Sequence, residues 1–444
     1  MCIRDRLWTI SDFPGYAVLS GWSTKGKLGC PNCHYCTSST YLKHSRKVVY
    51  MNHRKFLPPG HKLRYDCKRF NGMVETDVSP PPLSGMDIEE LLFGYENCFG
   101  KRDLKKRKRE TGCPFKKKSI FFELPYWREN LVRHNLDLMH IEKNICDKIL
   151  GTLLNLGGRT KDHLSARKDL QEMGIRKALH PIRIGDTNQY EIRAAIFDMT
   201  KKEKELFCSV FKNAKLPHGT TSNISRCVHI AERKIFGYKS HDAHFMLQYL
   251  LQFAVVKTSK PEVAVALLRL SAFFRGLCGK VIDLEDIPKL QEEIIEILCQ
   301  LETIFPPAFF DIMVHLPVHL CKELEFGGLV HLRWMFGIER YMCKLKSYVR
   351  NRSKPEGSMA EGYLADECIT FCSRFLNDTI KTKNEQNIHV GYSIGSRRNK
   401  DGKSVELEDK DWIKVHRYVL FNCGNIEIEK LLGYVLIYMF LVFI

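Results

Sequence analysis

Residues 305–352 read FPPAFFDIMVHLPVHLCKELEFGGLVHLRWMFGIERYMCKLKSYVRNR, and this stretch decides how the chain is organised. Its histidines His315 and His319 are four residues apart, so a helix would present both imidazoles on one face, where they can bind one zinc ion. Glu339 follows on a later helix that is rich in arginine and lysine. The stretch therefore predicts half of a zinc site, followed by an isolated carboxylate.

Cys30 and Cys33, in the sequence GCPNCHYC, are the best candidates for the two missing ligands, because a tight Cys-Pro-Asn-Cys turn can aim both sulfurs at one point. If the two pairs meet, a zinc ion clamps distant parts of the chain together. A redox pair or an incidental loop is the alternative, but the threonines and serines at 37–40 disfavour the helix that a redox motif needs. Cys36 and His34 remain as replacement ligands.

The composition indicates a globular protein with a polyanionic partner. A chain of 444 residues with 44% hydrophobic and 27% charged residues can form two or three domains. The 69 Lys and Arg exceed the 51 Asp and Glu by 18, and nucleic acid is the first expectation because neutralising its phosphates releases counterions. The 17 cysteines have no small-domain framework, so we expect reduced intracellular thiols without disulfides.

The sequence pattern divides the chain into five segments. The last of them ends in LLGYVLIYMFLVFI, which is shorter than the roughly 18 residues that span a bilayer, so we expect no membrane partner; a tail anchor is the alternative. The predicted segments are 1–75 with the Cys-x-x-Cys motif, a Pro-rich and basic linker at 76–118, a mainly helical region at 119–280, a second helical region at 281–380 with the two histidines and Glu339, and a loop-like segment at 381–444.

Several polar groups are candidate functional residues, each with a plain structural alternative. Asp12 follows a short predicted strand, where α/β enzymes display carboxylates, but it also suits capping of the Pro-Gly turn. Asp137, His140 and Asn144 share one face of a predicted helix, and form a metal or DNA site, a solvated face or a hydrogen-bonded interdomain contact.

Basic residues give two candidate DNA contacts. The block KRDLKKRKR at 101–109 is typical of nuclear import signals and of nucleic-acid contacts, or is a solvated charge run. Lys346 and Arg350 are predicted to share a helix face with Glu339, where a salt-bridged surface is the simpler explanation. The basic candidates in the block are Lys105, Lys106, Arg107, Lys108 and Arg109.

Five long strings match one known family. They are WTISDFPGYAVLSGWSTKGKLGCPNC, KSIFFELPYWRENLVRHNLDLMHIEKNICDKILGTLLN, LPHGTTSNISRCV, FFDIMVHLPVHLCKE and RWMFGIERYMCKLKSYVRNRSKPEGSMAEGYLADECITFCSRFL. Together they cover most of the chain from Leu7 to about Leu376, and they resemble the CACTA, or En/Spm, class of plant DNA transposases.

The resemblance implies an α/β plus α fold: a partial ribonuclease-H-like DDE catalytic core in segment 1–75, interrupted by a large helical insertion at 119–280 and closed by a Cys2His2 zinc clamp. In that wider group a Cys-x-x-Cys follows the second catalytic aspartate, and paired histidines precede the glutamate. Asp12 and Glu339 then become the carboxylates for Mg²⁺ or Mn²⁺. The zinc ligands become Cys30, Cys33, His315 and His319.

The family's first catalytic aspartate lies on a strand hairpin upstream of WTISDFPGY, and Met1 to Arg6 offer no substitute. We therefore expect an N-terminally truncated copy: a nuclear, self-associating transposase-related protein that binds terminal-repeat and target DNA but is inactive alone. The alternative is a domesticated DNA-binding or regulatory derivative without catalysis, and an acidic strand hairpin in the upstream reading frame would favour the enzyme.

Overall fold

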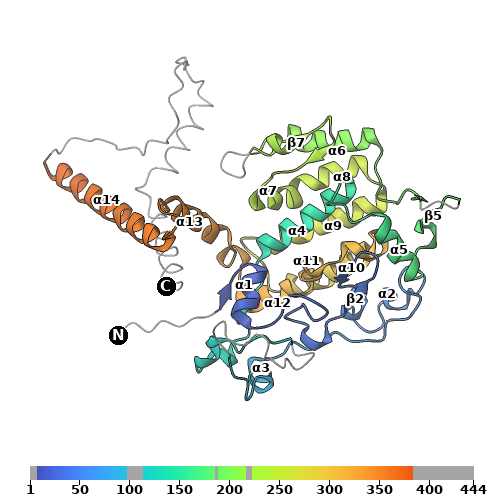
Figure 1. The fold of residues 1–444 in the computed structure, drawn as a ribbon, viewed down its shortest axis with the longest axis horizontal. Coiled ribbons are helices and arrows are strands. Elements are labelled where there is room, and N and C mark those ends of the chain that lie inside the picture. Colours follow the sequence, from blue (N-terminus) through green and yellow to red (C-terminus); the bar gives the residue numbers. More distant parts are fainter. Residues whose placement is uncertain (1–7, 98–113, 186–188, 217–222, 384–444) are drawn as a thin grey trace, which may run out of the picture. The chain divides into compact units, whose positions relative to one another are not determined.

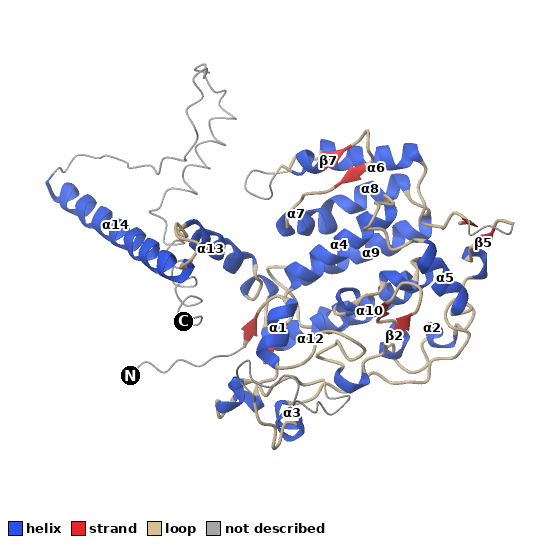
Figure 2. Cartoon of the chain, in the orientation of Figure 1, coloured by secondary structure: helices blue, strands red, loops and turns tan. Residues whose placement is uncertain are grey.

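The computed structural model describes residues 8–97, 114–185, 189–216 and 223–383. The chain divides into two compact units, one of residues 7–341 and one of residues 342–444 together with 1–6. Helices dominate the described residues, and the strands are short (Figure 2). None of the helices in the described ranges combines the length and apolar character that crossing a bilayer requires. The apolar segment 431–444 lies outside those ranges.

The elements follow one another along the chain as coloured in Figure 1. The α-helices are α1 (Phe13–Ser20), α2 (Lys62–Tyr65), α3 (Gly85–Leu91), α4 (Leu138–Leu153), α5 (Leu164–Glu172), α6 (Lys201–Asn213), α7 (Ser240–Phe245), α8 (Leu251–Thr258), α9 (Pro261–Leu277), α10 (Asp286–Ile304), α11 (Ile312–His315), α12 (Pro317–Gly327), α13 (Phe336–Ser347) and α14 (Pro355–Lys383). The strands are β1 (Thr9–Ile10), β2 (Thr40–Leu42), β3 (Lys47–Val49), β4 (His134–Asn135), β5 (Ile182–Arg183), β6 (Tyr190–Glu191), β7 (Val228–His229) and β8 (Lys234–Ile235). Short 3-10 helices cover His34–Cys36, His53–Phe56, Ile120–Glu123, Trp127–Glu129, Lys177–Leu179, Ile224–Cys227, Pro307–Phe309 and Val330–Leu332, and a π-helical turn at Met246–Leu250 joins α7 to α8.

The core of the larger unit is a stack of helices in which α9 packs against α8 and α10, and α10 against α12 (Figure 1). The apolar period of α4 predicts its buried face, and Ile141, Ile145 and Ile149 are indeed buried. The period of α10 predicts a helix that ends before Pro306, and α10 stops at Ile304. These two helix predictions are confirmed.

Strands β1 and β4 form the parallel pair among the described two-stranded sheets, with Thr9 opposite His134 and Ile10 opposite Asn135. The predicted boundary at residue 119 falls between them, although they pair directly. The carboxyl ends of parallel strands meet at one edge of a sheet, which is where α/β proteins place ligands. Asp12 follows β1 and Asp137 follows β4, so the pairing brings these two aspartates to the same edge.

One predicted segment contains a helix that the sequence pattern did not indicate, and one predicted boundary falls inside a helix. The segment 76–118 includes α3, which begins with a capping box between Ser84 and Asp87. In the smaller unit, α14 runs to Lys383 and thus past the predicted boundary at residue 380. The Asp366 carboxylate on α14 accepts hydrogen bonds from Lys344 Nζ and Tyr348 Oη, both at 2.7 Å.

Candidate metal centres

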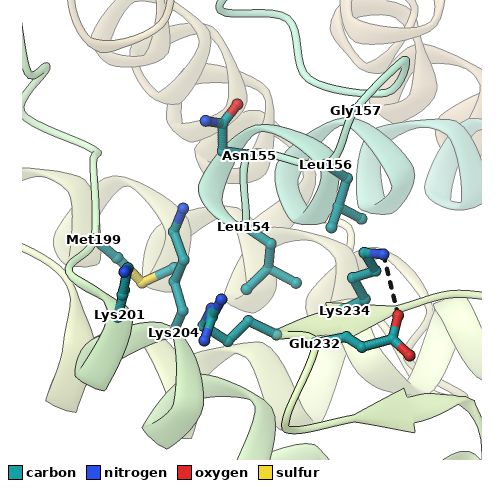
Figure 3. Close-up of a pocket in the computed structure, with 10 residues that line it drawn as sticks. Leu154, Asn155, Leu156, Gly157, Met199, Lys201, Lys204, Glu232 and Lys234 are labelled. Atoms are coloured by element: carbon teal, nitrogen blue, oxygen red, sulfur yellow. Dashed lines mark hydrogen bonds and ion pairs between the residues drawn. The ribbon is translucent and has the colours of Figure 1, made fainter.

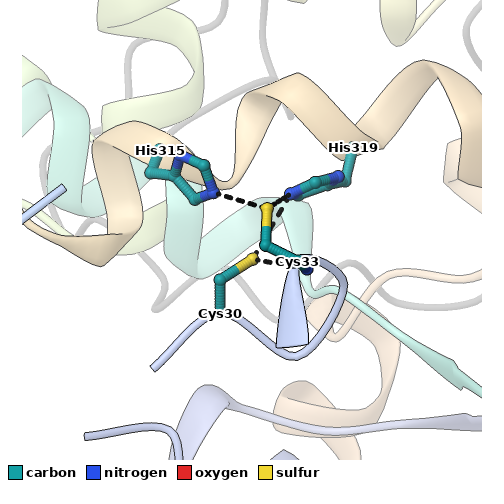
Figure 4. Close-up of side chains that lie close together, drawn as sticks. All are labelled: Cys30, Cys33, His315 and His319. Carbon is teal, nitrogen blue, oxygen red and sulfur yellow. Dashed lines mark hydrogen bonds between the residues drawn. The ribbon is translucent and has the colours of Figure 1, made fainter. Parts of the chain in front are cut away.

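Cys30, Cys33, His315 and His319 come together, as the sequence predicts (Figure 4). Cys33 Sγ lies 3.4 Å from His315 Nε2 and 3.3 Å from His319 Nε2, and Cys30 Sγ lies 3.3 Å from His319 Nε2. Two ligands of one tetrahedral zinc ion, one sulfur and one nitrogen, are roughly 3.5 Å apart. The four side chains therefore have the spacing and the ligand types that suit one zinc ion.

The two histidines do not share one continuous helix, because α11 ends at His315 and α12 begins at Pro317. Proline at the first helical position has no N–H to lose there, so it starts α12 rather than continuing α11. Leu316 keeps helical dihedral angles, and His319 N donates to Leu316 O at 2.9 Å. The chain thus keeps a helical path through the break, and both imidazoles face the cysteines.

A buried series of polar contacts orients His315 through its second ring nitrogen, Nδ1. His315 Nδ1 lies 3.3 Å from His53 Nε2, and His53 Nδ1 lies 2.5 Å from Glu302 Oε1. The three residues are 1%, 0% and 5% exposed, respectively. Histidines that bind metal usually donate their second ring N–H to such a partner, which fixes the tautomer. Residues 53 and 302 carry no local motif, and neither was predicted from the sequence.

Within this cluster Cys30 and His315 favour the forms that bind metal, whereas Cys33 favours the thiol and would release its proton on binding a metal ion. Burial alone would raise the pKa of the Cys30 thiol, but the hydrogen bond with Cys33 and the nearby imidazoles of His319 and His315 hold that pKa well below its usual value. The hydrogen bond to Cys30 and burial raise the pKa of Cys33. Burial lowers the pKa of His315 to about 4, so its imidazole is neutral. Neutral imidazole and thiolate are the forms that bind zinc.

Asp12 lies at the end of β1 and also caps α1. Its Oδ1 accepts a hydrogen bond from Gly15 N at 2.7 Å, as the capping alternative predicts. A Cβ on Gly15 would lie 2.7 Å from the same oxygen, so this turn needs glycine. The capping bond occupies one carboxylate oxygen, and capping therefore does not exclude a role in binding a cation.

A short series of hydrogen bonds connects the segment before Glu339 to β4 and its neighbours. Arg333 Nη1 donates to Asn135 Oδ1 at 3.0 Å and to Glu323 Oε2 at 3.3 Å. Glu323 on α12 in turn accepts from Leu136 N at 3.0 Å. Met335 N then donates to Asp137 Oδ1 at 3.3 Å. These bonds bring the start of α13 to the edge at which β1 and β4 end.

Glu339 is connected to this edge by its ion pair with His140. Glu339 Oε1 lies 3.5 Å from His140 Nε2, and His140 Nδ1 is hydrogen-bonded to Asp137. The hydrogen bond to Asp137 raises the pKa of His140, and the charges of Glu339 and Asp12 act in the same direction. The charges of the two predicted carboxylates therefore both act on His140, but Asp12, His140 and Glu339 are not among the described groups whose ligand atoms lie within 4.8 Å of one another.

The structure does not extend the helix face of Glu339 to both of the predicted basic residues. Lys346 lies in the last turn of α13, but α13 ends at Ser347, so Arg350 lies beyond the helix and does not extend its face. Within the described residues, the ion pair of Glu339 is with His140 rather than with Lys346 or Arg350. Residues 105–109 lie outside the described residues.

A buried polar network that was not predicted from the sequence connects α4, α7 and α9. Glu142 Oε2 lies 2.6 Å from His244 Nδ1, and Gln248 Nε2 donates to Glu142 Oε1 at 2.7 Å and to Cys278 Sγ at 3.2 Å. Because these groups satisfy one another, we assign the network to helix packing.

A basic hollow of about 290 Å³ lies between the end of α4 and the start of α6 (Figure 3). Its lysines Lys201 and Lys204 have no carboxylate partner among the ion pairs of the described residues, whereas Lys234 pairs with Glu232 at 3.1 Å. Burial lowers the pKa of Lys204, the charge of Asp198 opposes this shift, and the charge of Arg233 adds to it. Crowded cations of this kind suit a phosphate group.

Two family models match parts of the chain. Residues 4–93 match the Transposase family tnp2, and residues 277–390 match a Domain of unknown function (DUF4218). The first match indicates a transposon-related protein. The first stretch contains Asp12 and both cysteines of the Cys2His2 cluster, and the second contains both histidines and Glu339. No curated protein and no solved structure matches the chain.

We expect purified protein to carry close to one zinc ion per chain, and Cys33→Ser or His319→Ala to lose it. A structural zinc site contributes on the order of 10 kcal/mol to folding, so both variants should also melt far earlier. Glu302→Gln keeps all four ligands and should weaken zinc binding by about tenfold, because groups bonded to the residues behind a metal ligand fix its orientation and raise its affinity for the metal. Metal analysis and thermal melting measure these effects.

Cys36→Ser is the matched control, because Cys36 is exposed and is not one of the four clustered residues. It should retain zinc and melt like the parent chain. Full zinc content and an unchanged melting temperature in both ligand variants would show that these four residues hold no zinc.

The buried Glu323 predicts a pH dependence of stability. Burial raises its pKa to about 7, although Arg333 and the Leu136 N–H oppose the shift. A raised pKa means that this group stabilises the fold fully below its unfolded pKa of about 4.3, and that the contribution is lost as the pH rises through about 7. Between about pH 5.5 and pH 8, the free energy of unfolding of the parent chain should fall by about 2 kcal/mol relative to that of Glu323→Gln.

The free energy of unfolding, measured for both chains across this range, checks the prediction. The other titrating groups are common to both chains, so they cancel in the difference. Parallel pH profiles would show that Glu323 titrates normally in the folded chain.

Proposed function

We propose that this chain is part of a cut-and-paste DNA transposase of the CACTA (En/Spm) class. The observation that carries the proposal is the placement of the two predicted carboxylates on neighbouring elements: Asp12 follows β1, which pairs with β4, and Glu339 lies 3.5 Å from His140 in the helix that follows β4. The match of residues 4–93 to a transposase family supports the same class independently of the geometry.

In this proposal β1 and β4 belong to a ribonuclease-H-like catalytic core, and the helices that follow α4 belong to the insertion. The parallel pairing supports this, because such cores display their carboxylates at the ends of neighbouring strands. The Cys2His2 cluster then holds a structural zinc ion that connects the Cys-Pro-Asn-Cys turn to α11 and α12.

The reaction is the transfer of phosphoryl groups between DNA strands without a covalent enzyme intermediate. Asp12 and Glu339 would contribute to holding Mg²⁺ or Mn²⁺, which would activate a water or 3′-hydroxyl for in-line attack and neutralise charge on the phosphate. Asp12 and Glu339 fit this role because carboxylate oxygens suit magnesium and manganese, whereas the cysteines and histidines of the other cluster suit zinc. The upstream aspartate of the family completes the set in a longer protein.

Double-stranded DNA is the proposed partner, both at the element's terminal repeats and at the target. The net charge of +18 supports phosphate binding. Lys346, Arg350 and the basic block 101–109 are the proposed backbone contacts, together with the hollow around Lys204. We also propose a nuclear location and self-association, since two element ends must be held together for joint transfer.

A protein extended upstream to include the missing aspartate should cut terminal-repeat DNA with Mg²⁺ or Mn²⁺. Asp12→Asn and Glu339→Gln should each reduce cutting by at least about a hundredfold, because each removes a charged metal ligand and leaves the volume unchanged. Gel analysis of cleaved DNA measures this, alongside DNA affinity and zinc content, which both variants should keep.

Glu325→Gln on α12 is the control for loss of a carboxylate, since Glu325 is exposed, whereas Glu323 is held by Leu136 N and Arg333. The 444-residue chain alone should bind DNA without cutting it. Undiminished cutting by Glu339→Gln would remove Glu339 from the reaction. DNA binding with intact zinc but no cutting by the extended protein would favour a regulatory derivative.

Replacing the lysines and arginines of 101–109 with glutamine should move a tagged chain from the nucleus to the cytoplasm or flatten the salt dependence of DNA binding. For each phosphate that the protein no longer neutralises, the slope of log affinity against log salt should fall by about 0.9. Fluorescence microscopy and binding measured across a salt series give the two readouts.

The paired substitution Lys204→Gln with Arg233→Gln tests the hollow in the same salt series. Lys289→Gln removes an exposed lysine already paired with Asp286 and is the control for net charge.

For the 101–109 block, an unchanged location of the tagged chain and an unchanged salt slope would mean that the block is a solvated charge run.

A further inference from the structure

A pocket of about 520 Å³ lies at the start of β4, and α1, α3 and α12 all contribute residues to its lining. We call it the Tyr16 pocket. None of the described residues that line it is a proposed metal ligand or DNA contact. Pockets of about 300–1,000 Å³ hold drug-sized ligands, so one nucleotide or a molecule of similar size fits this volume.

The inner part of the Tyr16 pocket is aromatic. Trp22 and Phe115 belong to a small hydrophobic cluster that is separate from the main core, whereas Tyr16 belongs to the main core. The three side chains are 1%, 6% and 7% exposed, and the rings of Trp22 and Phe115 lie 4.9 Å apart between centroids. The pocket is thus a space that the two clusters leave unfilled between them, with packed walls.

The mouth of the pocket is apolar. Met86 on α3, Leu131 before β4 and Phe326 on α12 all line it, and they are 58%, 74% and 43% exposed. Single exposed apolar residues are common on protein surfaces, but several gathered around one pocket mark a binding site. A ligand with a flat apolar face would cover these side chains.

Two cations at the pocket are free to bind an anion. Lys322 and Arg133 line it, and neither has a carboxylate partner among the ion pairs of the described residues. Arg133 donates to Asn130 O at 2.9 Å and to Leu83 O at 3.3 Å, which leaves three of its five N–H groups for a ligand. Lys322 Nζ lies 5.9 Å from the ring centroid of Phe326, so a charge and an aromatic face are neighbours at the mouth.

The acidic groups of the pocket do not cancel these cations. The Glu323 carboxylate is held by Arg333 Nη1 at 3.3 Å, and Arg128 pairs with Glu89 at 3.5 Å outside the lining. Exposed Glu129 is the other acid among the described lining residues. Two unpaired cations against one exposed carboxylate favour an anionic ligand, and a phosphate suits them best.

Two buried polar side chains of the lining lack hydrogen-bond partners. The Tyr16 hydroxyl makes no hydrogen bond with the described residues, and neither does His34 Nδ1. Both side chains are 7% exposed. Folded proteins rarely leave buried polar groups unpaired, because each one costs free energy. A ligand with hydrogen-bonding edges supplies the missing partner of Tyr16.

A nucleotide combines a flat apolar face, hydrogen-bonding edges and an anionic phosphate. In a paired duplex, stacking and pairing cover the face and the edges of each base, so an unpaired nucleotide alone presents all three. We propose that the Tyr16 pocket binds one unpaired nucleotide of a DNA strand, with its base against Phe326 and Tyr16 and its phosphate on Lys322 and Arg133. The inference rests on the proposed function, because that function supplies DNA as the partner.

The test uses the full 444-residue chain, with its zinc content measured, and two duplexes of the same sequence. One duplex is fully paired, and the other carries a single unpaired thymidine. The chain should bind the second duplex at least about tenfold more tightly, because stacking of one base on aromatic side chains contributes about that much to affinity. Phe326→Ala should abolish the preference and leave the affinity for the paired duplex unchanged.

Phe253→Ala on α8 is the matched control, because Phe253 is 61% exposed and does not line the pocket. It should keep the full preference. Lys322→Gln should reduce the preference by about threefold, as expected for the loss of one exposed charge contact.

Tyr16→Phe separates ligand binding from a structural role. Because the hydroxyl is unpaired in the free chain, its removal should leave the melting temperature unchanged or raise it. The same change should reduce the preference for the unpaired nucleotide by about fivefold. A lower melting temperature together with an undiminished preference would show that the hydroxyl serves the fold, and would overturn its role in binding.

The outcomes separate this inference from the proposed function. Equal affinity for the two duplexes, with DNA binding and zinc intact, overturns the nucleotide pocket and leaves the proposed function standing. A preference that persists in both Phe326→Ala and Lys322→Gln places the unpaired base elsewhere and also overturns it. Free thymidine monophosphate that binds the parent but not Phe326→Ala, without any preference between the duplexes, replaces the DNA strand by a free nucleotide. Failure to bind either duplex overturns the proposed DNA partner itself.

Discussion

The meeting of Cys30 and Cys33 with His315 and His319 is the contact on which the rest of the structure depends. Cys33 and His315 are 282 positions apart, and their contact sets α11 and α12 against the N-terminal turn. From α12, Glu323 reaches Leu136 N at the end of β4. Each later contact that leads to Glu339 builds on this placement of α12, so the cluster and the acidic edge form one connected arrangement.

Two buried groups of ionic contacts support that arrangement, one against His315 of α11 and one between α12 and β4. Glu302 and His53 lie behind His315, and Arg333 connects Glu323 to Asn135. Burying such groups costs desolvation that their attraction only partly offsets, so their main effect here is on geometry rather than on net stability. They restrict the rotamers of the groups that face the two candidate metal sites. The fold thus places buried polar groups where side-chain position matters.

Local sequence patterns predicted the Cys2His2 cluster and several helices. The features that they did not predict, namely the strand pairing and the buried polar contacts, depend on contacts between distant segments. The four-residue spacing of His315 and His319 and the Cys-x-x-Cys turn are visible in sequence because each pair is local. Strands β1 and β4 have two residues each, too few for an alternating pattern. The polar row from Asp137 to Asn144 was ambiguous, since only the docking of Met335 and Glu339 distinguishes it from a solvated face. His53, Glu302 and Arg333 are single polar residues whose partners the sequence does not reveal.

The helix α13 begins in one compact unit and ends in the other. Glu339 is in its first turn, whereas Lys344, near its last turn, is bound to Asp366 on α14. An α-helix resists bending over three turns, because each turn is held by hydrogen bonds to the next. Glu339, in the larger unit, therefore lies on a helix whose remaining turns belong to the smaller unit, so a fragment that ended at the boundary between the units would remove the turns to which its own turn is hydrogen-bonded.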